Sequence, residues 1–163
     1  MPTTTQTDTA NEFDWDIIET ITNPDGSLFR IKTTFDTGLI QTDYYSGGAL
    51  SSSNEDDSAS QLYDWTTRSF SYDAAGILTN TSVTFDDGTS RFETYVDGIL
   101  NTVIENDWGD VNQHSWDRIQ SSYDETGTLY RQLTRYDDTS IKTEYFAANG
   151  QRTTSQITDT TDN

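Results

Sequence analysis

The alternation of apolar and polar residues along the chain predicts β-strands. Between Phe29 and Phe35 the odd positions are largely apolar and the even positions polar, which is the period of a strand with one buried and one wet face. Stretches of about seven to ten residues rich in Thr, Tyr, Phe, Ile and Val recur along the chain and are typical of strands. No segment shows helical periodicity over three turns, so the sequence predicts an all-β protein.

The strand pattern repeats three times, in copies of roughly fifty residues that begin at Trp15, Trp65 and Trp116. In each copy a Leu follows the Trp by 13 residues, and an aromatic residue follows that Leu by seven. Turn signals built on Asp, Asn and Gly occur three times per copy. Asp and Gly favour tight turns, so each copy is expected to contribute four strands.

The predicted fold is an antiparallel meander of about 10–12 strands in three repeats. Such a sheet could stay open and curved or close into a barrel, and propeller-like blades are the alternative. We expect a disordered or flexible N-terminal tail over residues 1–12, a single three-repeat domain over 13–158 and a flexible C-terminal tail over 159–163. Two polar stretches, Ser51–Gln61 and Asn106–Gln113, break the repeat and are expected to be loops.

Composition narrows the classes of function. Only 31% of residues are hydrophobic, and 28 acidic residues face nine basic ones, giving a net charge of −19. This charge opposes direct binding to nucleic acid or to an anionic membrane. Cysteine is absent, which excludes disulfides and thiolate chemistry. No classical signal peptide or transmembrane segment is visible, so the expected location is the cytoplasm or outside the cell by a route that needs no signal peptide.

A short motif carries a family resemblance. The pattern Tyr-Asp-x-x-Gly-x-Leu, at Tyr72–Leu78 and again at Tyr123–Leu129, resembles the YD repeats of Rhs-type and teneurin-type shells. It is also similar to MORN-like repeats of the form Tyr-x-x-x-Gly-x-Leu. The first copy departs from the pattern with Thr22-Asn23. The resemblance implies a curved, single-layer β-meander that wraps or scaffolds something and is not itself catalytic.

Catalytic motifs are missing from the sequence. His114 is the single histidine, and no Gly-x-Ser-x-Gly elbow, phosphate-binding loop or dinucleotide fingerprint occurs. A glycosidase needs two carboxylates at a set separation, for which the expected strands offer Glu19, Glu93, Glu105 and Glu144. However, Glu93 and Glu144 take similar places in successive copies, as does Asp43, which favours a structural role. No catalytic residue is therefore assigned.

Calcium is the one cofactor that the sequence leaves open. Candidate ligands are aspartates in turns, namely Asp86, Asp87, Asp137 and Asp138. The loop pattern of EF-hands and the glycine-aspartate pattern of calcium-binding β-rolls are both absent. Turn formation alone also explains these aspartates.

One cluster has no counterpart in the other copies. Trp108 is unmatched, and it lies close in sequence to Asp107, Asp110, His114 and Trp116. A rim of aromatic and polar side chains suits carbohydrate or peptide binding. These five residues are the candidate ligand-binding residues, and a longer hairpin loop with an anchoring Trp is the alternative interpretation.

The expected function is a non-enzymatic binding or scaffolding module from a bacterium or phage, with carbohydrate or protein as its ligand. Two alternatives stay open. The first is an acidic inhibitor that mimics nucleic acid and blocks a basic partner. The second is a carboxylate-dependent enzyme acting on a sugar. The repeat also leaves association into oligomers open.

Overall fold

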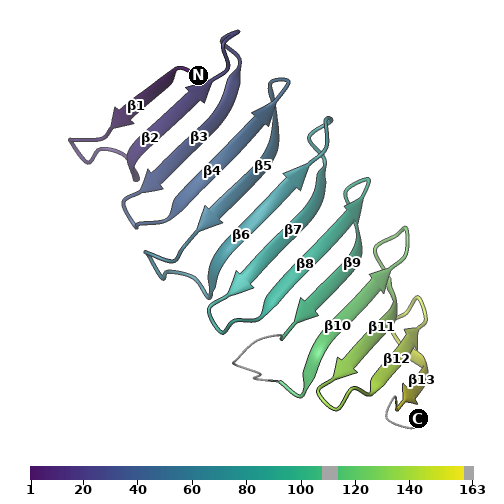
Figure 1. Ribbon diagram of the computed structural model, residues 1–163. Helices are drawn as coiled ribbons and strands as arrows, with labels where there is room; N and C mark the ends of the chain where they lie inside the picture. The colour runs from purple at the N-terminus through teal and green to yellow at the C-terminus, as the bar shows by residue number, and fades with distance from the viewer. Residues whose placement is uncertain (108–113, 160–163) are drawn as a thin grey trace. The chain divides into compact units, whose positions relative to one another are not determined.

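Thirteen strands follow one another in chain order in the single sheet of the computed structural model (Figure 1). The structure describes residues 1–107 and 114–159, and within them every regular element is a strand. β1 and β13 stand at the two ends of the strand order, so the sheet is open. The predicted all-β antiparallel meander is confirmed in its open form, and the barrel and the separate blades are excluded.

Each copy of the repeat contributes four strands, and one further strand, β1 (Thr3–Thr7), precedes them. The first copy forms β2 (Trp15–Thr22), β3 (Leu28–Phe35), β4 (Ile40–Ser46) and β5 (Ala49–Asp56). The second forms β6 (Trp65–Tyr72), β7 (Leu78–Phe85), β8 (Ser90–Val96) and β9 (Ile99–Asn106). The third forms β10 (Trp116–Tyr123), β11 (Leu129–Tyr136), β12 (Ile141–Phe146) and β13 (Arg152–Thr158).

β1 lies where the sequence predicts a flexible tail. Its five exposed residues, Thr3–Thr7, pair antiparallel with Ile17–Ile21 of β2. All five side chains are polar, so no alternation marks the segment as a strand, and the partner strand supplies the hydrogen bonds that order it. β1 explains why the strands number thirteen instead of about 10–12. Residues 160–163 of the predicted C-terminal tail lie outside the described residues.

The prediction of a loop over Ser51–Gln61 is wrong for the first half of this segment. Residues 51–56 belong to β5, which pairs with β4 on one side and with β6 on the other. Ser53 is buried despite its polar side chain. Polar residues form a central strand here because the ladder bonds on both edges satisfy the backbone, and no second layer demands an apolar face. Of the second predicted loop, Asn106 ends β9, and residues 108–113 lie outside the described residues.

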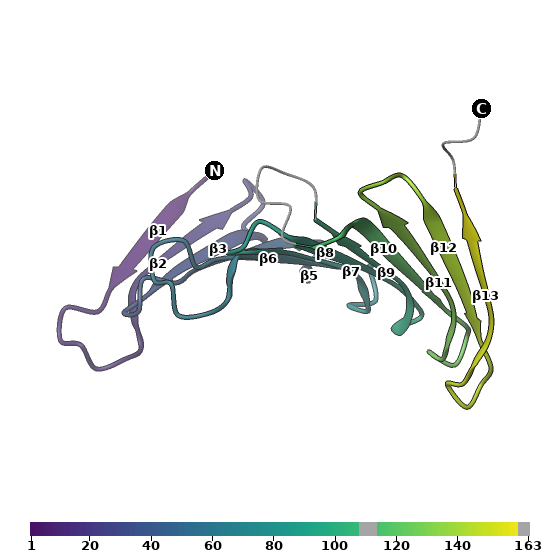
Figure 2. The same ribbon diagram turned by 90° about the horizontal axis from the view of Figure 1, so that it is seen from below.

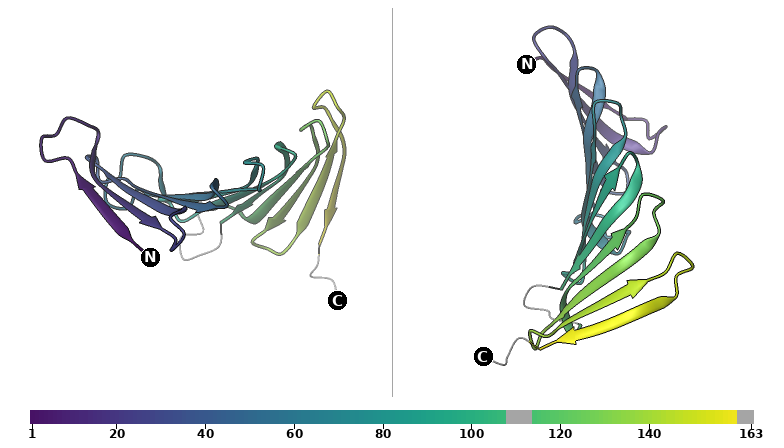
Figure 3. Two further views of the ribbon diagram at one scale, coloured as in Figure 1. Left: turned by 90° about the horizontal axis from the view of Figure 1, so that it is seen from above. Right: turned by 90° about the vertical axis from the view of Figure 1, so that its right-hand side faces the viewer.

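The chain divides into two units, residues 1–83 and 84–163, which are described separately. Unit 1 contains β1 to β6 and most of β7, and unit 2 contains β8 to β13. In each unit the described strands form one layer, with no second layer on either side (Figure 2). The turns between strands lie at the two ends of the strands (Figure 3). Both sides of the sheet are therefore surfaces.

Little apolar surface is buried in this single layer. Among the described residues, Trp65 and Val103 are the buried apolar side chains, whereas the buried polar ones are Ser53, Asp57, Thr81, Asp107, Ser121, Thr134 and Glu144. Stability must then come largely from ladder hydrogen bonds and from pairs of side chains across neighbouring strands, each worth about 0.2–1 kcal/mol. Cross-strand register consequently decides which side chains meet, and it defines the candidate sites described below.

Candidate functional site

A stacked pair of rings stands at the start of the first strand of each copy, and its second ring is the tryptophan that begins the strand. In unit 1, Phe13 stacks on Trp15 with ring centroids 5.4 Å apart, and Tyr63 stacks on Trp65 at 5.0 Å. In unit 2, His114 stacks on Trp116 at 4.9 Å with the ring planes within 7° of parallel. The histidine therefore takes the place of a Phe and a Tyr in the other two copies.

An aspartate holds each of these stacks in place. The first ring residue donates its backbone N–H to the carboxylate of an aspartate that directly follows the preceding strand: Phe13 to Asp8 at 2.8 Å, Tyr63 to Asp57 at 3.0 Å and His114 to Asp107 at 2.7 Å. Asp57 is 1% exposed and Asp107 4% exposed. We call this arrangement of aspartate, ring residue and tryptophan the junction motif.

Three of the five predicted ligand-binding residues are thus brought together by the junction motif. His114 contacts both Asp107 and Trp116, and each of the three has counterparts in the other copies. Their positions are therefore explained by the repeat itself, although His114 has no matching histidine. Trp108 and Asp110 lie outside the described residues. Ligand binding by this cluster stays a prediction.

The candidate catalytic carboxylates take part in ion pairs on the strands. Glu93 and Glu105 both contact Arg91, at 2.7 Å and 3.2 Å. Glu144 contacts Lys142 at 3.0 Å and Arg152 at 2.7 Å. Hydrogen bonds from Arg152 and then from Lys142 hold the pKa of Glu144 below its ordinary value.

Equivalent carboxylate contacts recur in every copy of the repeat. The fourth residue of the third strand of each copy is a carboxylate, namely Asp43, Glu93 or Glu144, and the residue two positions earlier donates to it. In unit 1 that donor is the amide of Gln41, at 3.1 Å from Asp43. A carboxylate and donor pair in every copy bridges neighbouring positions of the same face, which gives these acids a structural role.

The turn aspartates proposed as calcium ligands bond their own turns. Asp87 accepts the backbone N–H and the hydroxyl of Thr89 at 2.9 and 2.7 Å, and these hydrogen bonds, the hydroxyl first, lower the pKa of Asp87. Asp138 accepts the N–H of Ser140 at 2.9 Å. Among the described residues no group of three or more His, Asp or Glu side chains is arranged to hold a metal ion. Calcium binding stays a prediction without a geometric site.

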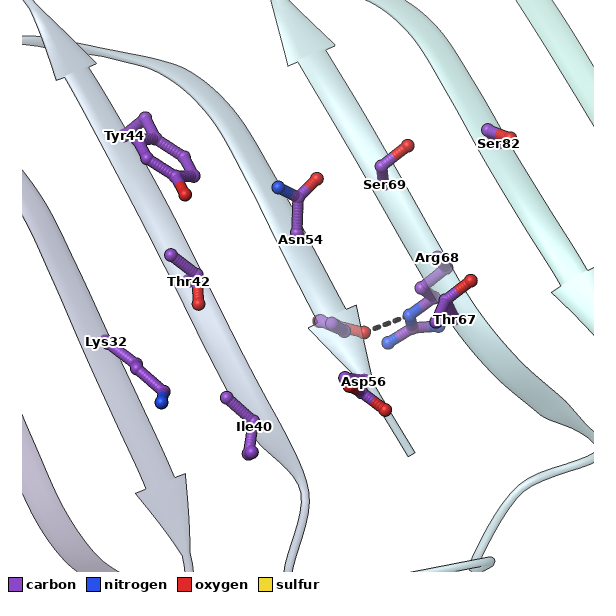
Figure 4. Close-up of a pocket in the computed structure, with 11 residues that line it drawn as sticks. Lys32, Ile40, Thr42, Tyr44, Asn54, Asp56, Thr67, Arg68, Ser69 and Ser82 are labelled. Carbon is purple, nitrogen blue, oxygen red and sulfur yellow. Dashed lines mark hydrogen bonds and ion pairs between the residues drawn. The ribbon is translucent and has the colours of Figure 1, made fainter. Parts of the chain in front are cut away.

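A hollow of unit 1 lies over β3 to β7 and has a volume of about 470 Å³. Register places Lys32, Thr42, Asn54 and Ser69 opposite one another in a single row across four strands. We call these four residues the groove row. Figure 4 shows the row together with Ser82 of β7 and with Tyr44, which stands on the same strand as Thr42. Six polar side chains from five strands therefore gather around one hollow.

A second row borders the hollow. Ile40, Asp56 and Thr67 are paired across β4, β5 and β6, two positions along each strand from the groove row. Asp56 accepts the backbone N–H of Ser58 at 3.0 Å. Hydrogen bonds from the side chain and then from the backbone of Ser58 lower the pKa of Asp56, so this carboxylate stays charged at the rim of the hollow.

Aromatic and charged groups tie β5 to β6 beside the hollow. Arg68 forms an ion pair with Glu55, and its guanidinium lies 4.6 Å from the ring centroid of Trp65. Arg68 and Glu55 are one residue out of step with the groove row, and both also line the hollow. By contrast, none of the ion pairs found among the described residues involves Lys32. The ammonium group of Lys32 is therefore available to a ligand.

In unit 2 three of the corresponding positions carry apolar side chains, whereas Gln120 and Thr143 stay polar at the positions of Ser69 and Thr42. Leu133 stands where unit 1 has Lys32, Ile104 where it has Asn54, and Phe92 where it has Thr42. Sequence reasoning missed the groove row because polar residues on a strand look like an ordinary wet face. A comparison of the same strand position between copies (Lys32, Ser82 and Leu133) is the signal that could have revealed it.

Comparison of the sequence with protein-family models and with curated proteins finds no match. Among the described residues, no helix has the length and apolar character needed to cross a bilayer.

Proposed function

We propose that this protein is a non-enzymatic β-repeat binding module that recognises a carbohydrate chain through the groove row of unit 1. The observation that carries the proposal is the gathering of hydroxyl, amide and ammonium groups of Thr42, Ser69, Asn54 and Lys32 in one row beside Tyr44. Sugars present hydroxyl groups that both donate and accept hydrogen bonds, and hydroxyl and amide side chains do the same.

The shape of the site supports an elongated ligand. The row crosses β3 to β6, and neighbouring strands of a sheet lie about 4.8 Å apart, so four strands offer contacts over roughly 14 Å. This length suits two or three sugar rings lying across the strands. Tyr44 provides the apolar ring against which the face of a sugar can lie, as aromatic side chains do in many small-molecule sites.

The differences between the copies at these positions indicate that the fold does not require a polar groove row. Unit 2 forms the same strands with Leu133, Ile104 and Phe92 at these positions. A polar row that the architecture does not need is better explained by recognition. The carboxylates of the third strands, in contrast, recur in every copy and are bound by neighbouring donors, which favours binding over carboxylate catalysis.

A glycan array followed by titration calorimetry would test the proposal. The informative variants place unit 2 residues into unit 1: Lys32→Leu and Asn54→Ile. We expect each to weaken binding at least about tenfold, which corresponds to about 1.4 kcal/mol, without loss of folding. Thr33→Leu, which changes the neighbouring residue on the opposite face of β3, is the matched control and should bind normally.

Three results would overturn the proposal. These are the absence of binding to any glycan, binding that both groove variants leave unchanged, and release of cleaved sugar from a bound glycan. The last of these would instead support a carboxylate-dependent enzyme.

A further inference from the structure

We propose that the outer edge of β13 binds strand β2 of a second copy of this chain, in place of that copy's own β1. This inference concerns the two ends of the strand order and does not depend on glycan binding by the groove row.

β1 and β13 occupy the same position in the repeat. β1, β5, β9 and β13 are each followed directly by an aspartate, namely Asp8, Asp57, Asp107 and Asp159. Their sequences are also alike, since Thr153–Asp159 reads TTSQITD and Thr3–Asp8 reads TTTQTD. β1 is thus a short, all-polar version of the strand that ends each copy.

Three of these four strands pair with the first strand of a copy. β1, β5 and β9 pair antiparallel with β2, β6 and β10, the strands that begin at a tryptophan. β13 pairs with β12, and among the described strands it has no neighbour on its other side. All seven residues of β13 are exposed. Its outer edge therefore offers the same ladder groups that β5 and β9 use to bind a tryptophan strand.

Strand direction favours β2 over β1 as the partner. A second copy that continues the sheet with its faces aligned would bring its β1 parallel to β13. If β1 is displaced, β2 meets β13 antiparallel, as in every other pair of this sheet. Antiparallel ladders have straighter hydrogen bonds than parallel ones and are slightly more stable.

The register of the existing pairs predicts the contacts of the exchanged strand. β1 sets Thr4 opposite Thr20 and Gln6 opposite Ile18. With β13 in that place, Ser155 would face Thr20 and Ile157 would face Ile18. Ile157 is 70% exposed in the present structure, so the exchange replaces a Gln–Ile pair with an Ile–Ile pair and covers an exposed apolar side chain.

The junction motif would also be kept in the exchanged pair. The N–H of Asp8 donates to the carbonyl of Asp16 at 2.9 Å, and Asp57 and Asp107 make the same bond to Thr66 and Asp117 at 2.8 and 2.9 Å. Asp159 stands at the same position after its strand and can take the place of Asp8. The net charge of −19 opposes association, so binding between copies should strengthen with salt, which screens charge repulsion.

Disulfide trapping in the full-length chain provides the direct test, because the protein contains no cysteine of its own. The double variant Thr20→Cys and Ser155→Cys places the two thiols opposite each other only in the proposed pair. Directly opposed residues of antiparallel strands have Cα atoms about 4.5–5.5 Å apart, within the range that a disulfide spans. We expect disulfide-linked oligomers on oxidation, in an amount that rises with protein concentration and salt.

Controls separate this geometry from other contacts. Thr20→Cys with Gln156→Cys is one residue out of register and should link poorly. Thr4→Cys with Thr20→Cys should close within one chain and show that β1 occupies its site in the monomer. Equal linkage of the out-of-register pair would overturn the proposal. So would linkage by Ser155→Cys alone, because that would indicate two β13 edges meeting each other.

Sedimentation velocity tests the energetics without cysteines. Removing residues 2–7 vacates the edge of β2 and should raise the association constant at least tenfold, whereas Ile157→Lys in the full-length chain should lower it at least tenfold. An association constant that Ile157→Lys leaves unchanged would contradict the proposal. A truncated chain that is folded by circular dichroism yet monomeric at the concentrations where the full-length chain associates would contradict it as well.

Discussion

Unit 1 and unit 2 use the same strands to present different surfaces. Across β3 to β6 the groove row is polar throughout, with Lys32, Thr42, Asn54 and Ser69. At three of the same positions unit 2 carries Leu133, Phe92 and Ile104, and Phe92 is 37% exposed. Because both sets are compatible with the same ladder, side chains on this face are free to vary.

Two sets of polar contacts recur in both units. Both units keep the junction motif, and both keep a carboxylate at the fourth position of the third strand. This single-layer sheet is therefore held by its ladder and by a few recurring polar contacts. Ligand recognition can then be placed on the face that the contacts do not use.

The junction aspartate should show the largest effect when it is removed. Asp57 is 1% exposed and accepts the N–H of Tyr63 and the hydroxyl of Ser60. Asp57→Ala leaves two part-buried donors without a partner and should lower the free energy of unfolding by about 2 kcal/mol. Urea denaturation followed by tryptophan fluorescence measures this value.

Asp8→Ala is the matched control for that experiment. Asp8 makes the same bond to Phe13, at 2.8 Å, but it is only half-buried. Water can replace the lost contact there, so the expected cost is about 1 kcal/mol. Equal costs at the two positions would show that burial does not control the strength of the junction motif.

The third-strand carboxylates should show the next largest effect, with a difference between units. Glu144 is bound by two cations, Lys142 and Arg152, whereas Asp43 is bound by the amide of Gln41. Glu144→Gln should cost about 1–2 kcal/mol and Asp43→Asn less than about 1 kcal/mol, because hydrogen bonds to charged groups are the stronger. Parallel urea titrations of the two variants test this order.

The pH dependence of Glu144→Gln gives an independent check. Because the pKa of Glu144 is lowered in the folded protein, its contribution to stability is fully present above the ordinary Glu pKa of about 4.3. The contribution is lost as the pH falls through the lower pKa of the folded state. The stability difference between wild type and variant should therefore shrink in acid, and a difference that does not change between neutral and acidic pH would contradict the ion-pair explanation.

The repeat and its turns could be predicted from the sequence because Gly, Asp and the periodic tryptophans leave a strong signal. β1 and the first half of the predicted Ser51–Gln61 loop could not, because Thr, Ser and Asn show no apolar alternation. β1 is ordered by its pairing with β2, and residues 51–56 are ordered by pairing with β4 and β6.

The candidate site was harder to predict, for two physical reasons. The groove row depends on cross-strand register, which bulges such as the one between Tyr44 and Tyr45 shift by one residue. The junction motif was concealed by loops of different lengths, since the ring follows its aspartate by five residues at Phe13, six at Tyr63 and seven at His114. The constant signal is a ring two residues before each repeat tryptophan.

A turn that differs between copies offers a stabilising substitution. Gly38, Gly88 and Thr139 hold the same turn position, with φ of 89°, 86° and 69°. This left-handed conformation is unfavourable for a β-branched residue and easy for glycine. Thr139→Gly should raise the free energy of unfolding by about 0.5–1 kcal/mol, as measured by thermal and urea unfolding. The reverse change, Gly88→Thr, should destabilise, and a neutral result for both would contradict the strain at Thr139.

The smallest effect on stability is expected for His114→Tyr. Substitutions at His114 also distinguish the two interpretations of the predicted cluster, which are ligand binding and a longer loop with an anchoring Trp. Because Phe13 and Tyr63 make the same stack in unit 1, His114→Tyr should keep the junction motif and change stability by less than about 0.5 kcal/mol. His114→Ala, which removes the stack on Trp116, should cost about 1 kcal/mol.

The same two proteins are then titrated with a glycan that the wild type binds. Unchanged affinity in His114→Tyr assigns the ring to architecture and leaves the groove row as the site. Loss of affinity in a folded His114→Tyr protein would move ligand recognition from unit 1 to unit 2, because only a ligand could distinguish a histidine from the tyrosine that the fold already accepts.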